Sequence, residues 1–399
     1  MGKLLWAGRF LVPETPLLVA QDRDVDHTKS ERHQKPMAVN LRASIDMLLS
    51  SEFWRMAIRW TLSLLYSRLL LLFRPSPSFP RRRRRLSPDP DSRIERPICV
   101  VTGATSGLGA AAARALSGEG YHVVLVGRCP QLLNKMMQGI KHQDKDAYLD
   151  AFVVDLSSIR SIVKFESSFK QWLTDSNLHP SVQLLINNAG IFAVSHRVTA
   201  DGYDKMVETN YIGAFVLTNL LLPLLKNSPV PSRIVNVTSF THRSVSDIEV
   251  DRENLSCLPT SGKYRCAHIY EYSKLCLLLF TYELHRQFYA KDLSADISVN
   301  SADPGAVETN IMRELPGCLS QLAFTVLRLL CLLQSPEEGV ASVVDAALAP
   351  EEVSGKYFFG GKGRTIRSSL LSYDARLATD LWSTSHMLLQ ESLLSQGGQ

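Results

Sequence analysis

Three glycines follow directly after a short apolar run, and this combination limits the folds open to the chain. Ile98–Thr102 has the composition of a buried strand, and the turn Thr102–Gly109 (TGATSGLG) leads into the alanine-rich stretch Ala110–Leu116. In a strand–turn–helix unit, glycines let the backbone approach a pyrophosphate, and the helix start offers N–H groups and a positive dipole. The spacing G-x-x-x-G-x-G differs from the G-x-G-x-x-G fingerprint. The turn therefore predicts a dinucleotide crevice, and a turn that serves only packing is the alternative.

Short apolar runs recur from Ile98 onward, with helical stretches between them. Runs of this length predict strands of a parallel sheet whose two faces are both covered by helices. The chain is therefore expected to be an α/β protein. The predicted strands are Ile98–Thr102, His122–Val126, Ala151–Val154, Leu184–Asn187, Arg233–Thr238 and Ile297–Ser301, with Gly355–Phe359 as the candidate seventh.

The residues that end the second and third runs bear on the choice of nucleotide. A carboxylate at the end of the second strand would bind a ribose 2′-hydroxyl, whereas an arginine accommodates a 2′-phosphate. The chain has Gly127-Arg128 there and no acidic residue, so NADP(H) is preferred over NAD(H). Asp155-Leu156 follows the third run, where it would meet the adenine. An aspartate that caps the next helix is the competing interpretation.

A tyrosine and a lysine four residues apart, Tyr270 and Lys274, point to acid–base chemistry. On a helix such residues project from one face, about 5–6 Å apart at Cβ. A nearby ammonium stabilises a phenolate, so we expect the lysine to lower the pKa of the phenol from roughly 10. The tyrosine would then be usable as a general acid and base. Alone the pair is a weak signal, because most such pairs are plain helix surface.

In their order and spacing, the motifs resemble those of the short-chain dehydrogenase/reductase family. They are TGATSGLG, NNAG at 187–190, Val207-x-x-Asn210-x-x-Gly213, Ser239 after a strand, YxxxK at 270–274 and Pro304-Gly305. The resemblance covers about 97–359. It implies one Rossmann-type domain, doubly wound, with a seven-stranded parallel sheet and helices on both faces. It also implies hydride transfer between a nicotinamide cofactor and an alcohol or carbonyl.

The resemblance implies a role for each matching residue. Tyr270 would donate and accept the proton, and Lys274 would lower its pKa and bind the nicotinamide ribose. Ser239 would orient the substrate oxygen, and Asn210 would hold a water of the proton relay. No metal ligand is implied. The implied cofactor-binding residues are Gly103, Thr105, Ser106, Gly107, Leu108, Gly109, Arg128, Asp155, Leu156, Asn188, Ala189, Gly190, Tyr270 and Lys274, with Pro304, Gly305 and Thr309 at the nicotinamide end.

Within the family, Ser273–Leu275 and Asp303–Thr309 resemble the retinol-dehydrogenase-like branch. That branch commonly has histidine before Pro-Gly, where this chain has Asp303, and the departure argues against a retinoid substrate. The apolar stretch Leu315–Leu333 would lie over the substrate mouth and would favour a lipophilic substrate, either isoprenoid, retinoid-like or steroid. A buried packing helix is the alternative, although Arg328 inside the stretch favours an interfacial helix with one wet edge.

Charge and cysteine content exclude several classes of protein. The chain has 399 residues and a net charge of +5, and residues 81–85 are five consecutive arginines. Outside that run the charges nearly cancel, so we expect a membrane or acidic surface near the run and no nucleic-acid partner. Seven cysteines without a C-x-x-C pair make a disulfide framework or a zinc site unexpected.

The chain divides into four expected segments. Residues 1–55 show no sustained period and receive no function. Residues 56–73 (MAIRWTLSLLYSRLLLLF) are just long enough to span a bilayer, but Arg59 and Arg68 interrupt them. A membrane-spanning anchor, an interfacial helix, and a soluble or cleaved leader all remain open. Residues 74–96 are expected to be a Pro/Arg-rich linker, and 97–399 the catalytic domain with a helical extension at its C-terminus.

Arginines directly after the apolar helix favour a cytoplasmic flank. We therefore expect attachment to a membrane through Met56–Phe73, at the endoplasmic reticulum, with the catalytic domain in the cytosol. A chloroplast location is the alternative. The expected partner is a small lipophilic substrate. A homodimer could form through the long helices predicted at Tyr203–Lys226 and Tyr270–Tyr289.

A second hypothesis of function keeps the fold but removes the reaction. The chain would then be a catalytically silent scaffold that binds nucleotide and senses redox state. The presence of all four implied catalytic residues argues against it: Asn210, Ser239, Tyr270 and Lys274. His242 and His268 flank these residues in the sequence and are expected to be core or solvated histidines, with a proton-relay role as the alternative.

Overall fold

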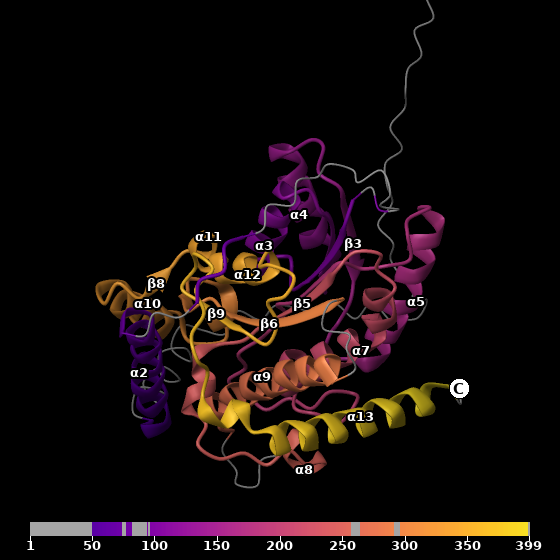
Figure 1. Cartoon of the computed structure of the whole chain (residues 1–399). Helices are drawn as coiled ribbons and strands as arrows, with labels where there is room; N and C mark the ends of the chain where they lie inside the picture. Colours follow the sequence, from indigo (N-terminus) through magenta and orange to yellow (C-terminus); the bar gives the residue numbers. More distant parts are fainter. Residues whose placement is uncertain are drawn as a thin grey trace, which may run out of the picture.

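A computed structural model describes residues 50–73, 77–81, 94, 96–256, 264–290 and 296–397, which leaves most of the predicted N-terminal segment and Arg82–Arg85 outside. Its centre is a seven-stranded sheet in the order β3-β2-β1-β4-β5-β6-β9, with every neighbouring pair parallel (Figure 1). The predicted doubly wound α/β fold is confirmed. The strands are β1 (Ile98–Thr102), β2 (His122–Gly127), β3 (Leu149–Val153), β4 (Leu184–Asn187), β5 (Ser232–Val237), β6 (Ile297–Asp303) and β9 (Tyr357–Phe359).

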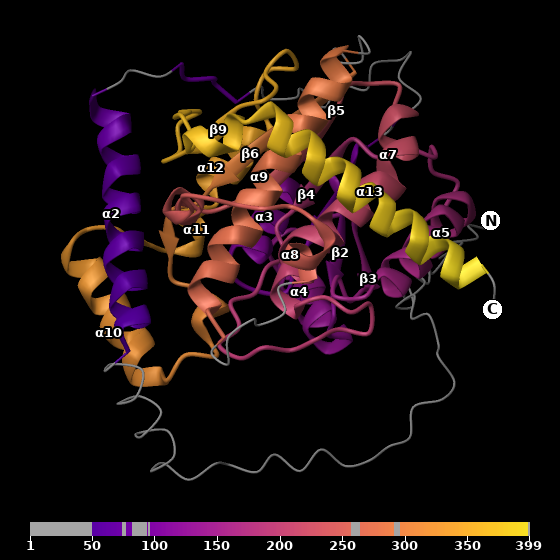
Figure 2. The same cartoon turned by 90° about the horizontal axis from the view of Figure 1, so that it is seen from below.

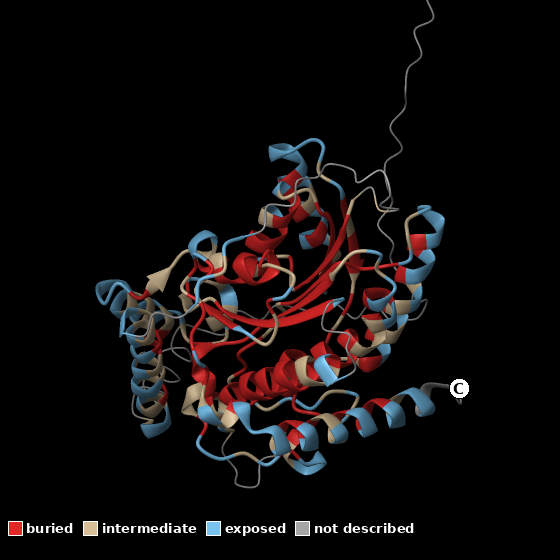
Figure 3. Cartoon of the chain, viewed as in Figure 1, coloured by how far each residue is buried: buried red, intermediate tan, exposed pale blue. Residues whose placement is uncertain are grey.

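Every predicted strand is present, with ends displaced by at most two residues. The strands β1, β2, β4, β5 and β6 are buried along their whole length (Figure 3). β1, β2 and β4 read as nearly continuous apolar runs, as expected of a covered parallel sheet, whereas β5 and β6 include buried polar residues. The strand order reverses between β1 and β4, which both pair with their neighbours in parallel. In open α/β sheets the crevice outside the carboxyl ends at such a reversal is the usual ligand site.

Helices cover both faces of the sheet (Figure 1). One face packs on α5 (Ile159–Asp175), α7 (Gly213–Lys226) and α9 (Cys266–Ala290), and the other on α3 (Gly107–Gly118), α4 (Pro130–Gln143) and α12 (Ala341–Ala347). The helix predicted over Tyr203–Lys226 is divided. Its first turns are α6 (Lys205–Val207) and a π-helical segment, η1 (Glu208–Ile212), before α7 begins. Shorter elements are η2 (Phe240–Ser244), α8 (Arg252–Ser256), β7 (Ala306–Val307), η3 (Asn310–Met312), β8 (Leu333–Gln334), α11 (Pro336–Gly339) and η4 (Leu370–Tyr373).

The C-terminal helix α13 (Ala375–Gly397) lies across α9 (Figures 1 and 2). Trp382 of α13 stacks on Phe280 of α9, with ring centroids 5.9 Å apart, and meets Phe215 of α7 edge-on at 5.3 Å. Trp382 thereby covers Phe280 on α9 and Phe215 on α7. The face that we expected to be open to a second copy is therefore covered by the chain's own C-terminus, and the structure does not support a homodimer through it.

The apolar helix α2 (Ser51–Phe73) begins before the predicted start at Met56 and packs on the flank of the domain beside α10 (Gly317–Leu329), as Figure 2 shows. Among the described residues, α2 is the one helix long and apolar enough to cross a membrane. Its inner edge is buried against the domain through Met56, Leu64 and Ser67. Its outer edge carries an exposed apolar stripe without charge: Trp54, Ile58, Leu62, Leu65, Leu69 and Leu72.

The two arginines that interrupt the apolar sequence do not join this stripe. Arg59 donates to the carbonyl of Ser244 at 3.2 Å, and Arg68 lies 5.8 Å from the ring centroid of Phe359. Both side chains reach toward the domain, but Arg68 is half-buried whereas Arg59 stays exposed. The apolar stripe is therefore flanked by an exposed cation.

Part of the predicted linker is folded onto the domain. The backbone N–H of Phe79 donates to the carbonyl of Gly363 at 2.9 Å. Arg81 pairs with the buried carboxylate of Asp345, with 2.7 Å between Nε and Oδ1. Gly363 has φ +68°, and a Cβ there would lie 1.9 Å from the carbonyl oxygen of Phe79. Residues 77–81 thus differ from the expectation of a linker without structure, because their contacts are with residues nearly 300 positions away.

Candidate active site

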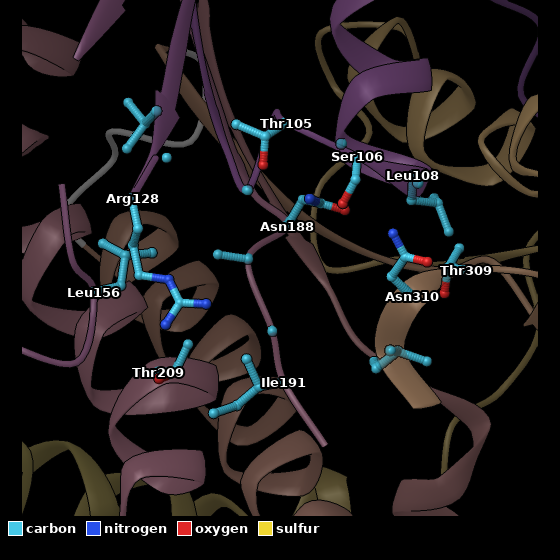
Figure 4. A pocket seen from close by; sticks show the side chains of 18 of the residues that line it. Thr105, Ser106, Leu108, Arg128, Leu156, Asn188, Ile191, Thr209, Thr309 and Asn310 are labelled. Atoms are coloured by element: carbon cyan, nitrogen blue, oxygen red, sulfur yellow. The ribbon is translucent and has the colours of Figure 1, made fainter. Parts of the chain in front are cut away.

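A crevice opens at the carboxyl ends of β1, β2, β3 and β4, where the strand order reverses (Figure 4). Most residues predicted to bind cofactor line it: Gly103, Thr105, Ser106, Gly107, Leu108, Gly109, Arg128, Asp155, Leu156, Asn188, Ala189, Gly190 and Thr309. Sequence analysis missed Ile191, Thr209, Asn310, Ile311 and Arg313, which also line the crevice. Thr209 and Ile191 adjoin predicted residues, whereas no sequence pattern marks Arg313.

The glycines of the first turn are required by close backbone approaches. A Cβ on Gly109 would lie 2.3 Å from the carbonyl oxygen of Gly103, and a Cβ on Gly103 would lie 2.9 Å from the Cα of Ala189. Ser106 caps α3 without a side-chain hydrogen bond, so the first N–H groups of the helix face the crevice unblocked. An uncapped helix start beside glycine backbone suits the pyrophosphate of a dinucleotide. The residues present therefore fit this class of cofactor.

Arg128 lines the crevice at the end of β2. Its side chain lies in the same part of the pocket as those of Leu156 and Thr209, while Ser106, Asn188 and Thr309 lie toward the other part (Figure 4). Asp155 lines the crevice, and its carboxylate also accepts from the backbone N–H and hydroxyl of Ser157, at 3.0 and 2.8 Å. The competing interpretation, in which Asp155 caps the next helix, is wrong: the N-cap of α5 is Ser158, whose side chain accepts from the N–H of Ser161.

Tyr270 and Lys274 lie on one face of α9, with 5.8 Å between the lysine Nζ and the centroid of the phenol ring. The Tyr270 phenol hydrogen-bonds with Ser239, so three of the four predicted catalytic side chains converge. Lys274 Nζ donates to the carbonyl of Val237 at 3.1 Å. It lies near Gly190, where an added Cβ would be 3.4 Å from Nζ. The lysine therefore connects the phenol to the deep end of the crevice.

The direction of the tyrosine's pKa shift differs from the expectation. Burial raises the pKa of Tyr270, the carboxylate of Asp303 raises it further, and the hydrogen bond with Ser239 partly offsets both. Burial also lowers the pKa of Lys274, to about 8, while Asp303 acts in the opposite direction. Desolvation outweighs the neighbouring cation because both groups are almost entirely removed from water. In this arrangement the phenol holds its proton and is a donor.

Asn210 lies in the π-helical segment η1, and both ends of its amide have protein partners. Its Oδ1 accepts from the N–H of Ile191 at 2.8 Å, and its Nδ2 donates to the carbonyl of Ile191 and the hydroxyl of Ser273, each at 3.0 Å. The amide thus joins the loop after β4 to the helix that carries Tyr270. The side chain of Asn210 therefore fixes this loop against α9, and its expected role in holding a water of the proton relay stays a prediction.

Asp303, noted in the sequence only as a departure, is fully buried behind the tyrosine–lysine pair. Its carboxylate accepts from the hydroxyl of Tyr357 at 2.5 Å and from the N–H of Gly305 at 2.8 Å. Burial raises the pKa of Asp303, and its two hydrogen bonds oppose the shift. Pro304 and Gly305 follow it but do not line the crevice. Pro304 instead accepts from Gln334 at 2.8 Å.

The sequence of the chain is similar to those of known dehydrogenases. A short chain dehydrogenase family model matches residues 97–246. The chain is 34% identical to polyprenol dehydrogenase of Homo sapiens, over 72% of this chain and 83% of that protein. It is 32% identical to retinol dehydrogenase 13 of Homo sapiens, over 73% and 83%. It is also 32% identical to the chloroplastic short-chain dehydrogenase TIC 32 A of Brassica napus, over 73% and 88%. The chain belongs to the short-chain dehydrogenase family.

The chain is therefore an oxidoreductase of the family's branch that is similar to retinol and polyprenol dehydrogenases, as its motifs indicated. Members of this family use a nicotinamide cofactor, and the glycine-lined crevice is where this dehydrogenase would hold it.

The substrate side of this dehydrogenase is roofed by α2. Trp60 of α2 meets the phenol of Tyr270 with ring centroids 5.6 Å apart, and meets Phe192 at 5.7 Å. Its indole N–H donates to the carboxylate of Glu271 at 2.7 Å. Nothing in the sequence of the apolar helix indicated that one of its residues reaches Tyr270, because this contact joins positions 210 apart.

The ring of His242 is bonded to backbone groups of Ser239 and Ser369, which does not fit a proton relay. Its Nε2 accepts from the N–H of Ser369 at 3.1 Å, so its Nδ1 carries the proton and donates to the carbonyl of Ser239 at 2.6 Å. Burial lowers the pKa of His242 to about 3, which keeps the ring neutral. It is a core histidine that fixes the segment after Ser239.

Proposed function

We propose that the chain is an NADP(H)-dependent, membrane-attached oxidoreductase that interconverts a lipophilic alcohol and its carbonyl. One observation carries the proposal: a buried tyrosine, hydrogen-bonded to Ser239 and adjacent to Lys274, lies between a dinucleotide crevice and an apolar roof. A substrate oxygen presented to this group would meet two hydroxyl donors, while the rest of the substrate would lie among aromatic side chains.

The chemistry follows from the arrangement. A bound nicotinamide would supply or accept the hydride at the substrate carbon. In reduction, the Tyr270 phenol donates its proton to the carbonyl oxygen, and the Ser239 hydroxyl donates a hydrogen bond to the developing charge. In oxidation, the phenolate takes the alcohol proton. Lys274 supports the phenolate by its charge, and Asn210 holds the loop at the deep end of the crevice.

NADP(H) is the proposed cofactor because Arg128 lies in the crevice at the end of β2, where the described lining residues include no glutamate and one aspartate, Asp155, on the neighbouring strand end. An arginine there can pair with a 2′-phosphate, whereas a ribose 2′-hydroxyl is usually bound by an acidic residue of that second strand.

The lipophilic substrate is supported by α2 and α10. Only Leu319 of α10 is buried, and Leu322, Val326, Leu329 and Leu330 are exposed, which disfavours a simple packing helix. Arg328 pairs with Glu308 at 2.8 Å along its polar edge. Two neighbouring helices with exposed apolar stripes flanked by single arginines suit attachment to a bilayer from which such a substrate enters. The names of the similar polyprenol and retinol dehydrogenases agree with this class.

For α2, we propose an interfacial helix that stays packed on the domain. A helix that crossed the bilayer would have to release the hydrogen bond of Trp60 and the burial of Leu64. We retain residues 97–399 as the catalytic domain and place the protein at the endoplasmic reticulum membrane, facing the cytosol. The similarity to a chloroplastic relative keeps the chloroplast as the alternative.

The test is a substrate panel on the purified full chain. Isoprenoid, retinoid-like and steroid alcohols and carbonyls are compared with short polar ones, each with NADP(H) and NAD(H). We expect turnover with lipophilic substrates and NADP(H). Activity confined to short polar substrates would contradict the substrate class, and equal rates with both nucleotides would contradict the cofactor. No turnover with any of them would favour the scaffold hypothesis.

A further inference from the structure

A second hollow lies on the outside of the domain, between α2 and the segment that follows β9. It measures about 1010 Å³ and is distinct from the cofactor crevice, with which it shares no residue. Three cations line it, Arg243, Lys356 and Arg367, and no aspartate or glutamate does. The other lining residues are Leu62, Ser63, Tyr66, Leu70, Pro77, Gly355, Tyr357, Thr365, Ile366, Ser368, Ser369, Leu370 and Tyr373.

The cations of this hollow are not neutralised by ion pairs in the described part of the chain. Arg243 donates to the hydroxyl of Ser67 at 3.2 Å and to the carbonyl of Arg367, and its guanidinium lies 5.4 Å from the ring centroid of Tyr66. Lys356 and Arg367 are exposed and take part in no salt bridge among these residues. The hollow therefore presents uncompensated positive charge to whatever lies outside it.

The three cations determine which ligand chemistry the hollow suits. Arginine and lysine donate charge-assisted hydrogen bonds, which a phosphate or carboxylate oxygen accepts. The absence of aspartate and glutamate from the described lining leaves no carboxylate there to repel such a group.

The edges of the hollow are apolar and exposed. Leu370 is 90% exposed, Leu62 59% and Tyr66 53%. Leu62 belongs to the uncharged outer stripe of α2, so the apolar edge of the hollow continues into that stripe. A ligand that filled both surfaces would need an anionic head and an apolar tail. A free phosphate would satisfy the cations but leave the apolar edge in water.

We propose that this hollow binds the headgroup of an anionic phospholipid, with the acyl chains lying along the outer stripe of α2. The site would orient the dehydrogenase on an anionic membrane surface, with α2 in the interface. It is separate from the reaction: Lys356 and Arg367 contact neither the crevice nor Tyr270 in the described structure. Each basic side chain near an anionic surface strengthens attachment about fivefold.

The experiment uses the full chain in micelles of a non-ionic detergent. Short-chain phosphatidylserine, short-chain phosphatidylcholine and inorganic phosphate are titrated separately, and binding is measured by calorimetry. We expect saturable binding of phosphatidylserine alone. The double variant K356Q/R367Q should weaken it by roughly 30-fold, since it removes two cations. Both side chains are exposed, so the variant is expected to fold, which its thermal unfolding curve checks.

A matched control removes two cations elsewhere. K135Q/K141Q changes two exposed lysines of α4, on another side of the domain (Figure 1), and should leave the affinity unchanged. Equal weakening in both double variants would overturn the proposal, because it would show general charge attraction and no site. Phosphatidylcholine or inorganic phosphate binding as tightly as phosphatidylserine would also overturn it, as would a K356Q/R367Q variant that binds like the original chain.

Discussion

The indole ring of Trp60 packs against the phenol ring of Tyr270, with 5.6 Å between the centroids, and donates its N–H to the adjacent Glu271 at 2.7 Å. A residue of the apolar N-terminal helix is therefore part of the environment of the catalytic tyrosine. The helix that would attach the enzyme to the membrane also closes its substrate side. The same helix, α2, would therefore affect both membrane attachment and the access of substrate to the site.

The hydroxyl of Tyr270 is expected to be essential for turnover. General acid–base catalysis contributes about 10²–10⁴-fold, so Tyr270→Phe should lower the rate at least a hundredfold. NADPH affinity should survive, because the crevice is lined by other residues. Tyr272→Phe is the matched control: that hydroxyl donates to the carbonyl of Glu249 at 3.1 Å, outside the proposed chemistry. Steady-state rates and a fluorescence titration with NADPH check both variants, and unchanged turnover in Tyr270→Phe would contradict the mechanism.

Arg128 is expected to decide between the two nicotinamide dinucleotides. Charge-assisted hydrogen bonds are worth about 1.5–3 kcal/mol, so Arg128→Ala should weaken NADPH binding by roughly 10- to 100-fold. NADH has no 2′-phosphate, and its dissociation constant should hardly change. Arg114→Ala, an exposed arginine of α3 outside the crevice, serves as the control. Equal losses for the two dinucleotides would mean that Arg128 does not select the phosphate.

The hydrogen bond from Trp60 is expected to stabilise the roof. Trp60→Phe keeps an aromatic ring beside Tyr270 but leaves the buried carboxylate of Glu271 without its indole donor. Such a loss is worth about 1–3 kcal/mol, which should lower the melting temperature by several degrees. Trp54→Phe changes an exposed residue of the same helix and should leave it unchanged. Calorimetric melting curves that coincide for the two variants would show that the helix is not held by this contact.

Asp303 is expected to set the pH dependence of the reaction. Its carboxylate raises the pKa of Tyr270, so Asp303→Asn should lower that pKa. The rise of kcat/KM with pH in the oxidation direction would then move to lower pH. The control is Asp345→Asn, a buried carboxylate that pairs with Arg81. A shift toward higher pH, or the same shift in both variants, would contradict the assignment.

The helix period alone was enough to place Tyr270 and Lys274 together, because residues four apart share a face whatever surrounds them. It was not enough to predict the pKa of the phenol. That value depends on desolvation by Trp60 and Phe192 and on the charge of Asp303, which come from three other parts of the chain. For the same reason, the sequence did not indicate that the side chain of Asn210 bonds to Ile191 and Ser273.

The sequence by itself determined the strands of the sheet, the glycine turn and most residues of the crevice, since these follow from local composition: most buried strands read as apolar runs, and close backbone approach requires glycine. Only the tertiary structure decided that α2 roofs the site, that residues 77–81 pair with the segment after β9, and that α13 covers α9. Those contacts join residues 100 to nearly 300 positions apart. The sequence pattern of neither segment indicates which segment it will contact. Composition shows that a surface will be covered, and packing alone shows which part of the chain covers it.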